Sequence, residues 1–292
     1  MPVRALDHLV LGTTDLDALA NVFEALGFRI GTRNRHPWGT ENRIIQLSDE
    51  TFLELITLGE GAEIPPHQPG HFSFGAFVRD SLARAPGLSM LALKSSDAKA
   101  DAAHFAHEGI GAFAPFHFGR KGKRPDGSET EVAFTLAFAH ERSMPDCGFF
   151  TCQQHFPQNF WAPAMQQHRN GATGITRVTL VAENPSDHHV FLSSYAGSRE
   201  MQANSTGIAM PCGLGLLEII SKESFRFLYG SAPPAGDKPR FAGFSVAMPS
   251  AAATAADAAK LGLAVAECPG GFTVLPRPDF LTAIRFEDRP AP

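Results

Sequence analysis

The sequence predicts an α+β fold made of four tandem βαβββ units. The first observation is a local pattern that occurs four times: a short apolar strand, a helix-capping residue, a helix rich in alanine and large apolar side chains, and a glycine. The second observation is the regular spacing. Counted from the start of the strand, the capping residue lies eight or nine residues further on, and the glycine 20 to 22 residues further on. The third is that further strand-like segments with turn residues follow each glycine. A repeat of this kind is typical of a chain built from similar supersecondary units.

The first unit begins with the apolar strand Leu6–Leu11 and its helix ends at Gly27. Thr14 or Asp15 is the expected N-cap, because short oxygen-bearing side chains accept hydrogen bonds from free amides at a helix start. Apolar side chains then recur at the spacing of one helical face, at Leu16, Leu19, Phe23 and Leu26. Strands are expected after the glycine at 28–32, 43–47 and 51–58.

The other units repeat this plan. Their first strands are expected at 88–93, 175–180 and 242–247, with N-caps at Ser96, Asn184 and Ser250 and closing glycines at Gly109, Gly197 and Gly262. Their later strands are expected at 113–118, 131–138, 149–154, 214–221, 272–275 and 281–286. The last strands of units one and three also match in detail, since each places a glutamate, Glu54 or Glu218, among large aliphatic residues.

A single unit has one apolar sheet face and one helix, which is too little to enclose a core, so the four units are expected to form two pairs. The segments 65–75 and 166–173 are rich in turn-forming or polar residues and are predicted to be linkers. We therefore predict an N-terminal domain at 1–165 and a C-terminal, degenerate pair at 172–292.

Composition excludes several classes of function. The formal net charge is −5, so no basic field attracts nucleic acid or an anionic membrane. No stretch approaches the length of a membrane span and the N-terminus does not resemble a secretory signal, so a cytoplasmic location is expected. The four cysteines form no CxxC pair, which is typical of buried thiols.

Three segments carry a resemblance to a known family: Leu6–Leu11 followed by Thr14–Leu16, the strand Phe52–Ile56, and the run His155–Trp161. The sequence resembles the vicinal oxygen chelate superfamily and, within it, the glyoxalase-like domain proteins, over residues 3 to about 173. The resemblance implies that paired βαβββ modules form curled-sheet, glyoxalase/dihydroxybiphenyl-dioxygenase-like domains, each a cup around a divalent metal. Such proteins include isomerases, dioxygenases, transferases and ligand-binding proteins, so fold alone names no reaction.

His8 and Glu54 are the predicted catalytic residues and metal ligands. In the superfamily, ligands lie on the first and last strands of modules, and imidazole and carboxylate groups suit Zn²⁺, Fe²⁺ or Mn²⁺. A glutamate among Phe52, Leu53, Leu55 and Ile56 is expected to be buried and to need a cation. That cation could be a metal, Arg43 on the neighbouring strand, or the proton of His8.

The third ligand is expected on the last strand of module two, where Gln153 and His155 alternate onto one face. His155 would complete a two-histidine, one-carboxylate set with open positions for substrate. Gln153 could take the same place, or His155 could merely begin the following loop. Module two ends without a carboxylate, which argues against glyoxalase-type isomerisation and favours a dioxygenase or hydrolase-like use of the site.

A small-molecule substrate is the expected partner, and the predicted substrate-binding residues are Trp38, Arg43, Phe150, Gln153 and Trp161. The loop 36–42 is expected at the mouth of the cup. The basic residues at 120–124 form either a solvated turn or a contact for an anionic substrate. Glu218 is expected to form a buried salt bridge with Arg177, and no metal is expected in the C-terminal pair.

The leading hypothesis is therefore a metal-dependent dioxygenase, lyase or isomerase that chelates adjacent oxygens of a small substrate. The alternative is a metal-free protein of the same fold that sequesters a small molecule against its phenylalanines. A third hypothesis is a structural role, in which exposed sheet edges support a homodimer.

Overall fold

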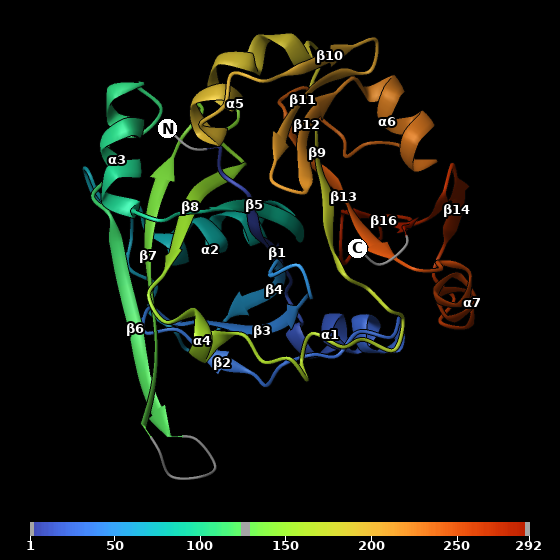
Figure 1. The fold of residues 1–292 in the computed structure, drawn as a ribbon, viewed down its shortest axis with the longest axis horizontal. Helices are drawn as coiled ribbons and strands as arrows, with labels where there is room; N and C mark the ends of the chain where they lie inside the picture. Colours follow the sequence, from blue (N-terminus) through green and yellow to red (C-terminus); the bar gives the residue numbers. More distant parts are fainter. Residues whose placement is uncertain (1–2, 124–128, 290–292) are drawn as a thin grey trace.

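The computed structural model describes residues 3–123 and 129–289, and these residues form two curled sheets flanked by helices (Figure 1). The first sheet contains β1 (Leu6–Gly12), β2 (Asn34–Arg35), β3 (Thr40–Gln46), β4 (Phe52–Leu58), β5 (Gly87–Lys94), β6 (Phe116–Lys123), β7 (Glu129–Ala139) and β8 (Gly148–Gln154). The second contains β9 (Gly174–Val181), β10 (Gln202–Asn204), β11 (Gly207–Cys212), β12 (Gly215–Ile220), β13 (Arg240–Met248), β14 (Val265–Cys268), β15 (Gly271–Val274) and β16 (Ala283–Asp288). The helices are α1 (Leu16–Ala25), α2 (Phe74–Arg84), α3 (Ala98–His107), α4 (Pro157–Phe160), α5 (His189–Ala196), α6 (Lys222–Tyr229) and α7 (Ala252–Lys260), with a 3₁₀ turn at Pro185–His188.

Both sheets have the same topology. The strand orders are β2-β3-β4-β1-β5-β8-β7-β6 and β10-β11-β12-β9-β13-β16-β15-β14. In each module the first strand pairs in parallel with the last, and the two modules of a sheet join through an antiparallel pair, β1 with β5 or β9 with β13. The prediction of an α+β fold with four βαβββ modules in two pairs is confirmed.

The helices α2 and α6 were not predicted, and neither was the short α4, because all three lie outside the repeated pattern. The segment 65–75, expected to be a linker, already contains the start of α2, whose N-cap Ser73 accepts a hydrogen bond from the amide of Ala76. Ser221 caps α6 in the same way, accepting from the amide of Ser224. These serine caps are the sequence signals that could have predicted both helices.

Most predicted helix starts are correct to within a residue. Asp15 is the N-cap of α1. The caps of α3 and α7 are Asp97 and Ala251, one residue after the predicted Ser96 and Ser250. Asn184 precedes a 3₁₀ turn rather than an α-helix and its side chain makes no capping bond.

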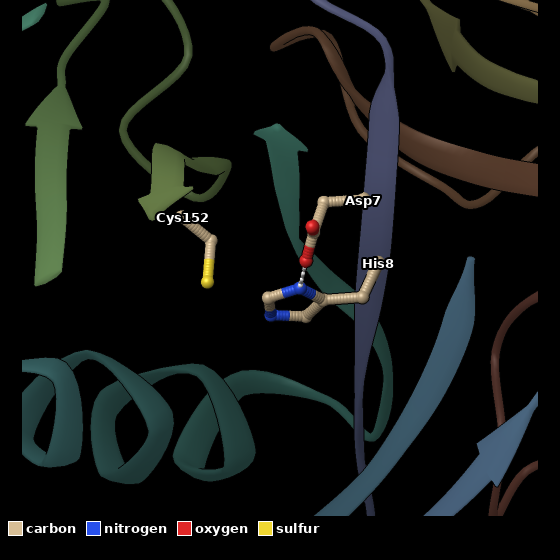
Figure 2. A group of neighbouring side chains, drawn as sticks. All are labelled: Asp7, His8 and Cys152. Carbon is tan, nitrogen blue, oxygen red and sulfur yellow. Dashed lines mark hydrogen bonds and ion pairs between the residues drawn. The ribbon is translucent and has the colours of Figure 1, made fainter. Parts of the chain in front are cut away.

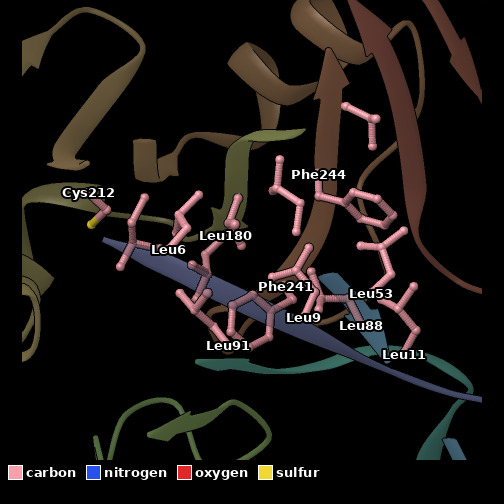
Figure 3. Packing of buried hydrophobic residues seen from close by; sticks show 14 of the residues in the cluster. Leu6, Leu9, Leu11, Leu53, Leu88, Leu91, Leu180, Cys212, Phe241 and Phe244 are labelled. Atoms are coloured by element: carbon pink, nitrogen blue, oxygen red, sulfur yellow. The ribbon is translucent and has the colours of Figure 1, made fainter. Parts of the chain in front are cut away.

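The main core lies between the outer, convex faces of the two sheets. Leucines of β1, such as Leu9 and Leu11, pack there with residues of the second sheet, including Leu180 and Phe241 (Figure 3). Helices α1, α3, α5 and α7 also contribute buried side chains to this cluster. The convex faces are therefore used for packing, and only the concave faces remain to form cups.

The concave faces have their own smaller clusters. In the first sheet, α2 contributes Phe74, Phe77 and Val78 to a cluster with residues of β1, β4, β5, β7 and β8. In the second sheet, α6 contributes Phe225 and Tyr229. Each cup is thus partly filled by the helix that the repeat did not predict.

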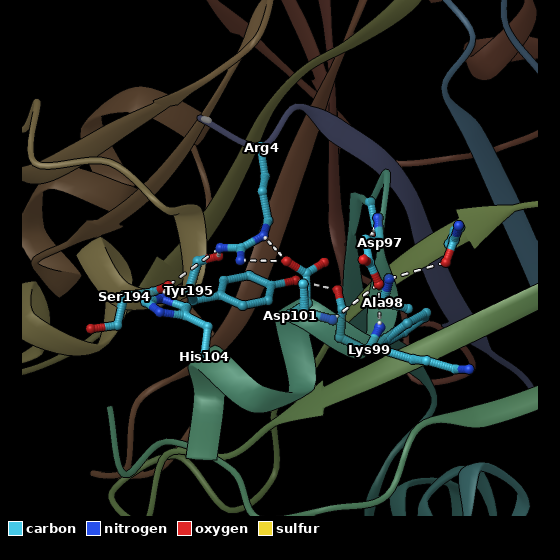
Figure 4. A network of polar contacts seen from close by, with 12 residues as sticks. Arg4, Asp97, Ala98, Lys99, Asp101, His104, Ser194 and Tyr195 are labelled. Atoms are coloured by element: carbon cyan, nitrogen blue, oxygen red, sulfur yellow. Dashed lines mark hydrogen bonds and ion pairs between the residues drawn. The ribbon is translucent and has the colours of Figure 1, made fainter. Parts of the chain in front are cut away.

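A buried polar network links the beginning of the chain to α3 and α5 (Figure 4). The Arg4 guanidinium donates to the Asp101 carboxylate at 2.6 Å and to the backbone oxygen of Tyr195 at 2.7 Å. The Tyr195 hydroxyl in turn donates to the backbone oxygens of Leu91 and Phe150, each at 2.8 Å. The network therefore ties the second half of the chain to β5 and β8 of the first sheet. Across the described ranges, no helix has both the length and the apolar character that a membrane span requires.

Candidate functional site

A cavity of about 140 Å³, open to solvent on one side, lies in the cup of the first sheet. Its walls are mainly apolar and come from Pro37, Trp38, Ile44, Phe52, Phe74, Phe118, Val132, Phe134, Leu136, Phe150 and Phe160. Its polar side chains are those of His8, Asn34, Arg35, His36, Asn42, Glu54, Arg120 and Cys152. An apolar pocket with a few convergent polar groups is the usual form of a small-molecule site.

A β-bulge brings Asp7 to the same side of β1 as His8, which lines this cavity. Along β1, Leu6 pairs with Leu93 and His8 pairs with the adjacent residue Ala92, so Asp7 is one residue in excess. Because of this irregularity, the consecutive residues Asp7 and His8 point to the same side of β1 (Figure 2). Bulges often re-aim side chains next to functional sites.

The imidazole of His8 is buried and held in a defined orientation. Its Nδ1 lies 2.5 Å from Oδ1 of Asp7, and its ring stacks on Phe52 with the centroids 4.1 Å apart. An ionised carboxylate can only accept a hydrogen bond, so Nδ1 carries a proton and Nε2 is the atom that faces the cavity. Nε2 lies 3.9 Å from Oε2 of Glu54.

Glu54 lies between two histidines. Its Oε1 accepts a hydrogen bond from Nδ2 of Asn42 at 2.6 Å and is 3.7 Å from Nε2 of His36. The carboxylate is only 5% exposed, as its apolar neighbours in the sequence predicted. Glu54 therefore presents one oxygen to His8 and one to the side occupied by Asn42 and His36.

His36 is positioned by its own loop. Its Nδ1 is 2.8 Å from Oγ1 of Thr40, and its ring stacks on Trp38 with centroids 4.4 Å apart. Burial lowers the pKa of His36 below its ordinary value, although the Glu54 charge opposes that effect. His36 is thus neutral at pH 7, and it does not supply the positive charge that would balance Glu54.

Cys152 faces His8 across the cavity (Figure 2). Ligand atoms of Asp7, His8 and Cys152 all lie within 4.8 Å of one another, and the thiol is 3% exposed. Burial is the largest cause that raises the pKa of Cys152, and the charges of Asp7 and Glu54 raise it further. The thiol is therefore protonated at pH 7 in the absence of a bound cation.

The charge balance of this site is unusual. Asp7 and Glu54 are both buried carboxylates, and within residues 3–123 and 129–289 neither forms an ion pair with lysine or arginine. In the described part of the chain, the ionisable side chains that contact these two carboxylates are those of His8 and His36. Since an unpaired buried carboxylate is costly, the site favours a cation.

The structure brings together some of the predicted site residues and separates others. His8, Glu54, Trp38 and Phe150 all line the cavity. Arg43 does not: it lies on the opposite face of β3, where its Nε donates to the backbone oxygen of Gly31, so it cannot be the cation for Glu54. Trp161 does not line the cavity but packs against Phe52 and Phe160. Its neighbour Phe160 lines the cavity instead.

Gln153 and His155 do share a face, but it is the wrong face for a ligand. Gln153 bonds to the amide of Ala98 and the carbonyl of Ser96 at the start of α3. The exposed ring of His155 is 2.7 Å from the hydroxyl of Thr135, the residue that pairs with Gln153 on β7. Phe150 and Cys152 occupy the cavity face of β8 instead, so neither predicted third ligand lies near His8 and Glu54.

Sequence reasoning missed the roles of four residues: Asp7, His36, Asn42 and Cys152. His36 and Asn42 lie in or next to the loop predicted at the mouth of the cup, and the loop does line the cavity. Cys152 lies two residues after Phe150 on β8, so the two side chains share a face of the strand. This spacing was the available signal for Cys152. Asp7 gave no such signal, because strict alternation cannot place two consecutive residues on one side.

Arg120 is also at the cavity wall, where its Nη1 donates to Oδ1 of Asn34 at 2.5 Å. This contact joins β6 to β2, the two edge strands of the first sheet. The Arg120 side chain therefore does not belong to a purely solvated turn, because it forms part of the cavity wall. Arg124 lies outside the described residues.

The second cup has a different interior. Arg177 forms the predicted salt bridge with Glu218, whose other oxygen accepts from the Thr179 hydroxyl at 2.6 Å. Phe244, which the repeat aligned with His8, instead packs in the core between the sheets. Ser245 lies opposite Arg177 on β13, as Ala92 lies opposite His8 on β5.

The fold and the cup with its first-strand histidine and last-strand glutamate define a vicinal oxygen chelate protein. A family model described as "Glyoxalase-like domain" matches residues 6–195, and the chain belongs to that family. No curated protein matches the chain.

Solved structures show the same fold. A hypothetical protein from Staphylococcus aureus aligns with a TM-score of 0.66 at 12% identity, over 98% of this chain and 99% of its own. A mutant of 4-hydroxymandelate synthase from Streptomyces coelicolor aligns with a TM-score of 0.55 at 10% identity, over 100% of this chain and 95% of its own. A xylose isomerase-like TIM barrel/4-hydroxyphenylpyruvate dioxygenase fusion protein aligns with a TM-score of 0.52 at 12% identity, over 100% of this chain and 50% of its own. At these identities the likeness extends to the fold only.

Proposed function

We propose that the chain is a metal-dependent enzyme whose active site is the N-terminal cavity, acting on a small, largely apolar molecule that carries two adjacent oxygens. The observation that carries this proposal is the pair formed by Nε2 of His8 and Oε2 of Glu54. These atoms face each other at 3.9 Å in an apolar cavity. Glu54 and Asp7, which contacts His8 from outside the cavity lining, are both buried carboxylates, and neither is paired with a lysine or arginine among the described residues.

The residues present fit a divalent cation. Ligand atoms about 2.0–2.2 Å from one ion lie roughly 3–4 Å apart, and the distance between His8 and Glu54 falls within that range. Asp7 would act behind His8, fixing its tautomer and orientation, as carboxylates commonly do for metal-binding histidines. A divalent ion would also offset the charges of Asp7 and Glu54.

When bound, such an ion supplies Lewis-acid stabilisation of negative charge on substrate oxygens. The chain itself supplies the rest of the site. Asn42 holds one oxygen of Glu54, which leaves the other directed at His8. Phe52, Phe74 and Phe150 exclude water and pack against the apolar body of the substrate.

A dioxygenase-type reaction is more consistent with this site than glyoxalase-type isomerisation. The isomerisation relies on a glutamate from each module, and the first module has Glu54. In the second module, the strand positions that match His8 and Glu54 are Met90 and Phe150, both buried in the apolar cluster of the cup. The metal would be Zn²⁺, Fe²⁺ or Mn²⁺.

The test is the metal content of the full chain purified without added metal. Wild-type protein should contain about one ion per chain, and His8→Ala and Glu54→Gln should each lose it. Glu218→Gln, which removes the matching acid in the second cup, is the control for general damage and should keep the ion. Wild-type protein that binds no added Zn²⁺, Fe²⁺ or Mn²⁺ would contradict the proposal.

A second candidate function is metal-free binding of an apolar or aromatic molecule, which the eleven apolar wall residues favour. Binding of an aromatic probe dye to chelator-treated wild-type protein, unchanged by added metal, would support this function. A loss of dye binding in Phe150→Ala would place the dye in the cavity.

A further inference from the structure

Arg120 is a cation at the mouth of the cavity, and no described residue neutralises its charge. Its side chain is exposed and lines the cavity, and its Nη1 donates to Oδ1 of Asn34 at 2.5 Å. A guanidinium has five N–H donors. Within residues 3–123 and 129–289 this hydrogen bond uses one of them, and no carboxylate pairs with Arg120. The remaining donors and the positive charge are therefore available to a ligand.

A second arginine of the cavity wall, Arg35, is already engaged. Its Nη1 lies 3.3 Å from Oε1 of Glu41, and Oε2 of the same carboxylate is paired with Arg33 at 2.7 Å. Its guanidinium thus has an acidic partner inside the protein. The charge that remains for a ligand at the mouth of the cavity is that of Arg120.

Aromatic side chains lie between Arg120 and the metal site that we propose. Along β6, Phe118 and Arg120 are two residues apart and share the cavity face. The rings of Phe118 and His36 have their centroids 6.0 Å apart, and Nε2 of His36 lies 3.7 Å from Oε1 of Glu54. A molecule that lies along these side chains has one end at Glu54 and the other at Arg120.

The walls between these two ends suit a flat apolar body. The ring of Phe134 stacks on Phe118 with the centroids 5.3 Å apart, and it meets Phe160 edge-on at 5.7 Å. A purely apolar ligand would leave Arg120 unused, so a ligand that satisfies both regions is amphipathic. One guanidinium matches the single charge and the two parallel oxygens of a carboxylate, whereas a phosphate dianion calls for a further cation.

Building on the proposed function, we propose that Arg120 recognises a carboxylate at the end of the substrate that is remote from the metal. The substrate class is then an apolar acid. Its two adjacent oxygens lie at the inner end, its flat body lies between the phenylalanines, and its carboxylate lies at the mouth of the cavity. Arg120 is thus a specificity-determining residue, which contacts the substrate but takes no part in bond making.

Two matched probes, 2-naphthoate and 2-naphthamide, test this proposal, because they share one flat body and differ by the negative charge. Isothermal titration calorimetry of the full chain as purified should show naphthoate bound about tenfold more tightly than naphthamide. Arg120→Gln should bind the two probes with affinities within about twofold of each other. Arg120→Lys, which keeps the charge without the planar fork, should fall between these results.

Two further variants locate the effect. Arg142→Gln removes an exposed arginine that is not part of the cavity lining, and it should keep the wild-type preference for naphthoate. Phe134→Ala removes part of the cavity wall and should weaken the binding of both probes. Metal content measured on the same preparations should be equal in wild type and Arg120→Gln, because Arg120 is not part of the pair formed by His8 and Glu54.

The outcomes separate the two proposals. Equal binding of the probes by wild type, a preference that persists in Arg120→Gln, or unchanged binding in Phe134→Ala overturns the role of Arg120 and leaves the metal site standing. A wild-type chain that prefers naphthoate through Arg120, but contains no metal and takes up none, overturns the proposed metal-dependent function and leaves the carboxylate-binding role of Arg120 in place.

Discussion

The two sheets share one topology, but the glutamate at the matching position of each sheet has a different partner. Glu54 and Glu218 occupy the same position on β4 and β12, next to the parallel first strand of their module. Glu218 is paired with Arg177, whereas the residue at the position of Arg177 in the first sheet is His8. Arginine is a permanent internal cation, while histidine leaves the neighbouring carboxylate short of positive charge. One side chain thus separates an internally neutralised cup from one that favours a bound cation.

The two cups also differ in how they are filled. In the second, the ring of Tyr229 packs against Gly243, where even a Cβ atom would lie 2.7 Å from the ring. The Tyr229 hydroxyl reaches Oγ1 of Thr179 at 2.7 Å, beside Glu218. In the first cup, the aromatic side chains line a cavity instead of closing it. The second cup is therefore suited to support, and the first to ligand binding.

The largest expected effect is on stability, from Arg177→Met. The substitution leaves the Glu218 carboxylate buried without its cation, and we expect a loss of about 3 kcal/mol in the free energy of unfolding. Urea denaturation of wild type and variant measures this. The double variant Arg177→Met/Glu218→Leu should recover much of the loss. A loss below about 1 kcal/mol in the single variant would mean that the salt bridge does not define the second cup.

The comparison can be reversed by His8→Arg, which gives the first cup the arginine of the second. The introduced guanidinium should pair with Glu54 and displace the cation, so metal content should fall to background while the fold is retained. Elemental analysis and far-ultraviolet circular dichroism measure the two properties. His8→Gln is the control for loss of the imidazole alone. Retention of one ion per chain in His8→Arg would show that Glu54 and His8 do not hold it.

A smaller effect on the same site is expected from Asp7→Asn. An amide cannot stabilise the Nδ1–H of His8 as a carboxylate does, so metal affinity should fall about 10- to 100-fold with the fold unchanged. Competition with a chelating dye measures this affinity. Asp101→Asn, in the network around Arg4, changes a buried carboxylate away from the cavity and should leave the affinity as in wild type.

Tyr229→Phe tests the filled cup by removing a single hydroxyl. The loss of its hydrogen bond with Thr179 should cost about 1 kcal/mol of unfolding free energy, with no change in the metal content of the first cup. Chemical denaturation and elemental analysis on the same preparation give both values. A change in metal content would mean that the two cups are coupled.

The smallest expected effect concerns the segment between the sheets and depends on pH. Burial lowers the pKa of His168 below 6.5, and its Nδ1 accepts from the amide of Arg29, which requires that atom to be unprotonated. Below about pH 6.5 the unfolded chain binds a proton at this residue that the folded chain resists, so unfolding becomes easier as the pH falls. His168→Gln should reduce this slope between about pH 7.5 and 5.5 in urea denaturation. An unchanged slope would assign the pH dependence to other histidines.

Much of the architecture could be predicted because the signals are local. Strand, cap, helix and glycine are close together in each module, and their spacing repeats. The match between the Glu54 and Glu218 strands likewise appears in the printed sequence and in the register of β4 and β12. The helices α2, α4 and α6 were missed since they do not belong to the repeated unit.

The sequence by itself determined the four modules, their pairing, and the positions of His8 and Glu54 on first and last strands. Alternation along β8 also placed Gln153 and His155 on one face, but only the tertiary structure decided that this face meets α3 and not the cavity. Only the tertiary structure likewise showed the bulge that places Asp7 and His8 on one side of β1. The physical reason is that periodicity relates residues close in the chain, whereas the choice of face depends on which side of a sheet packs against its distant partner.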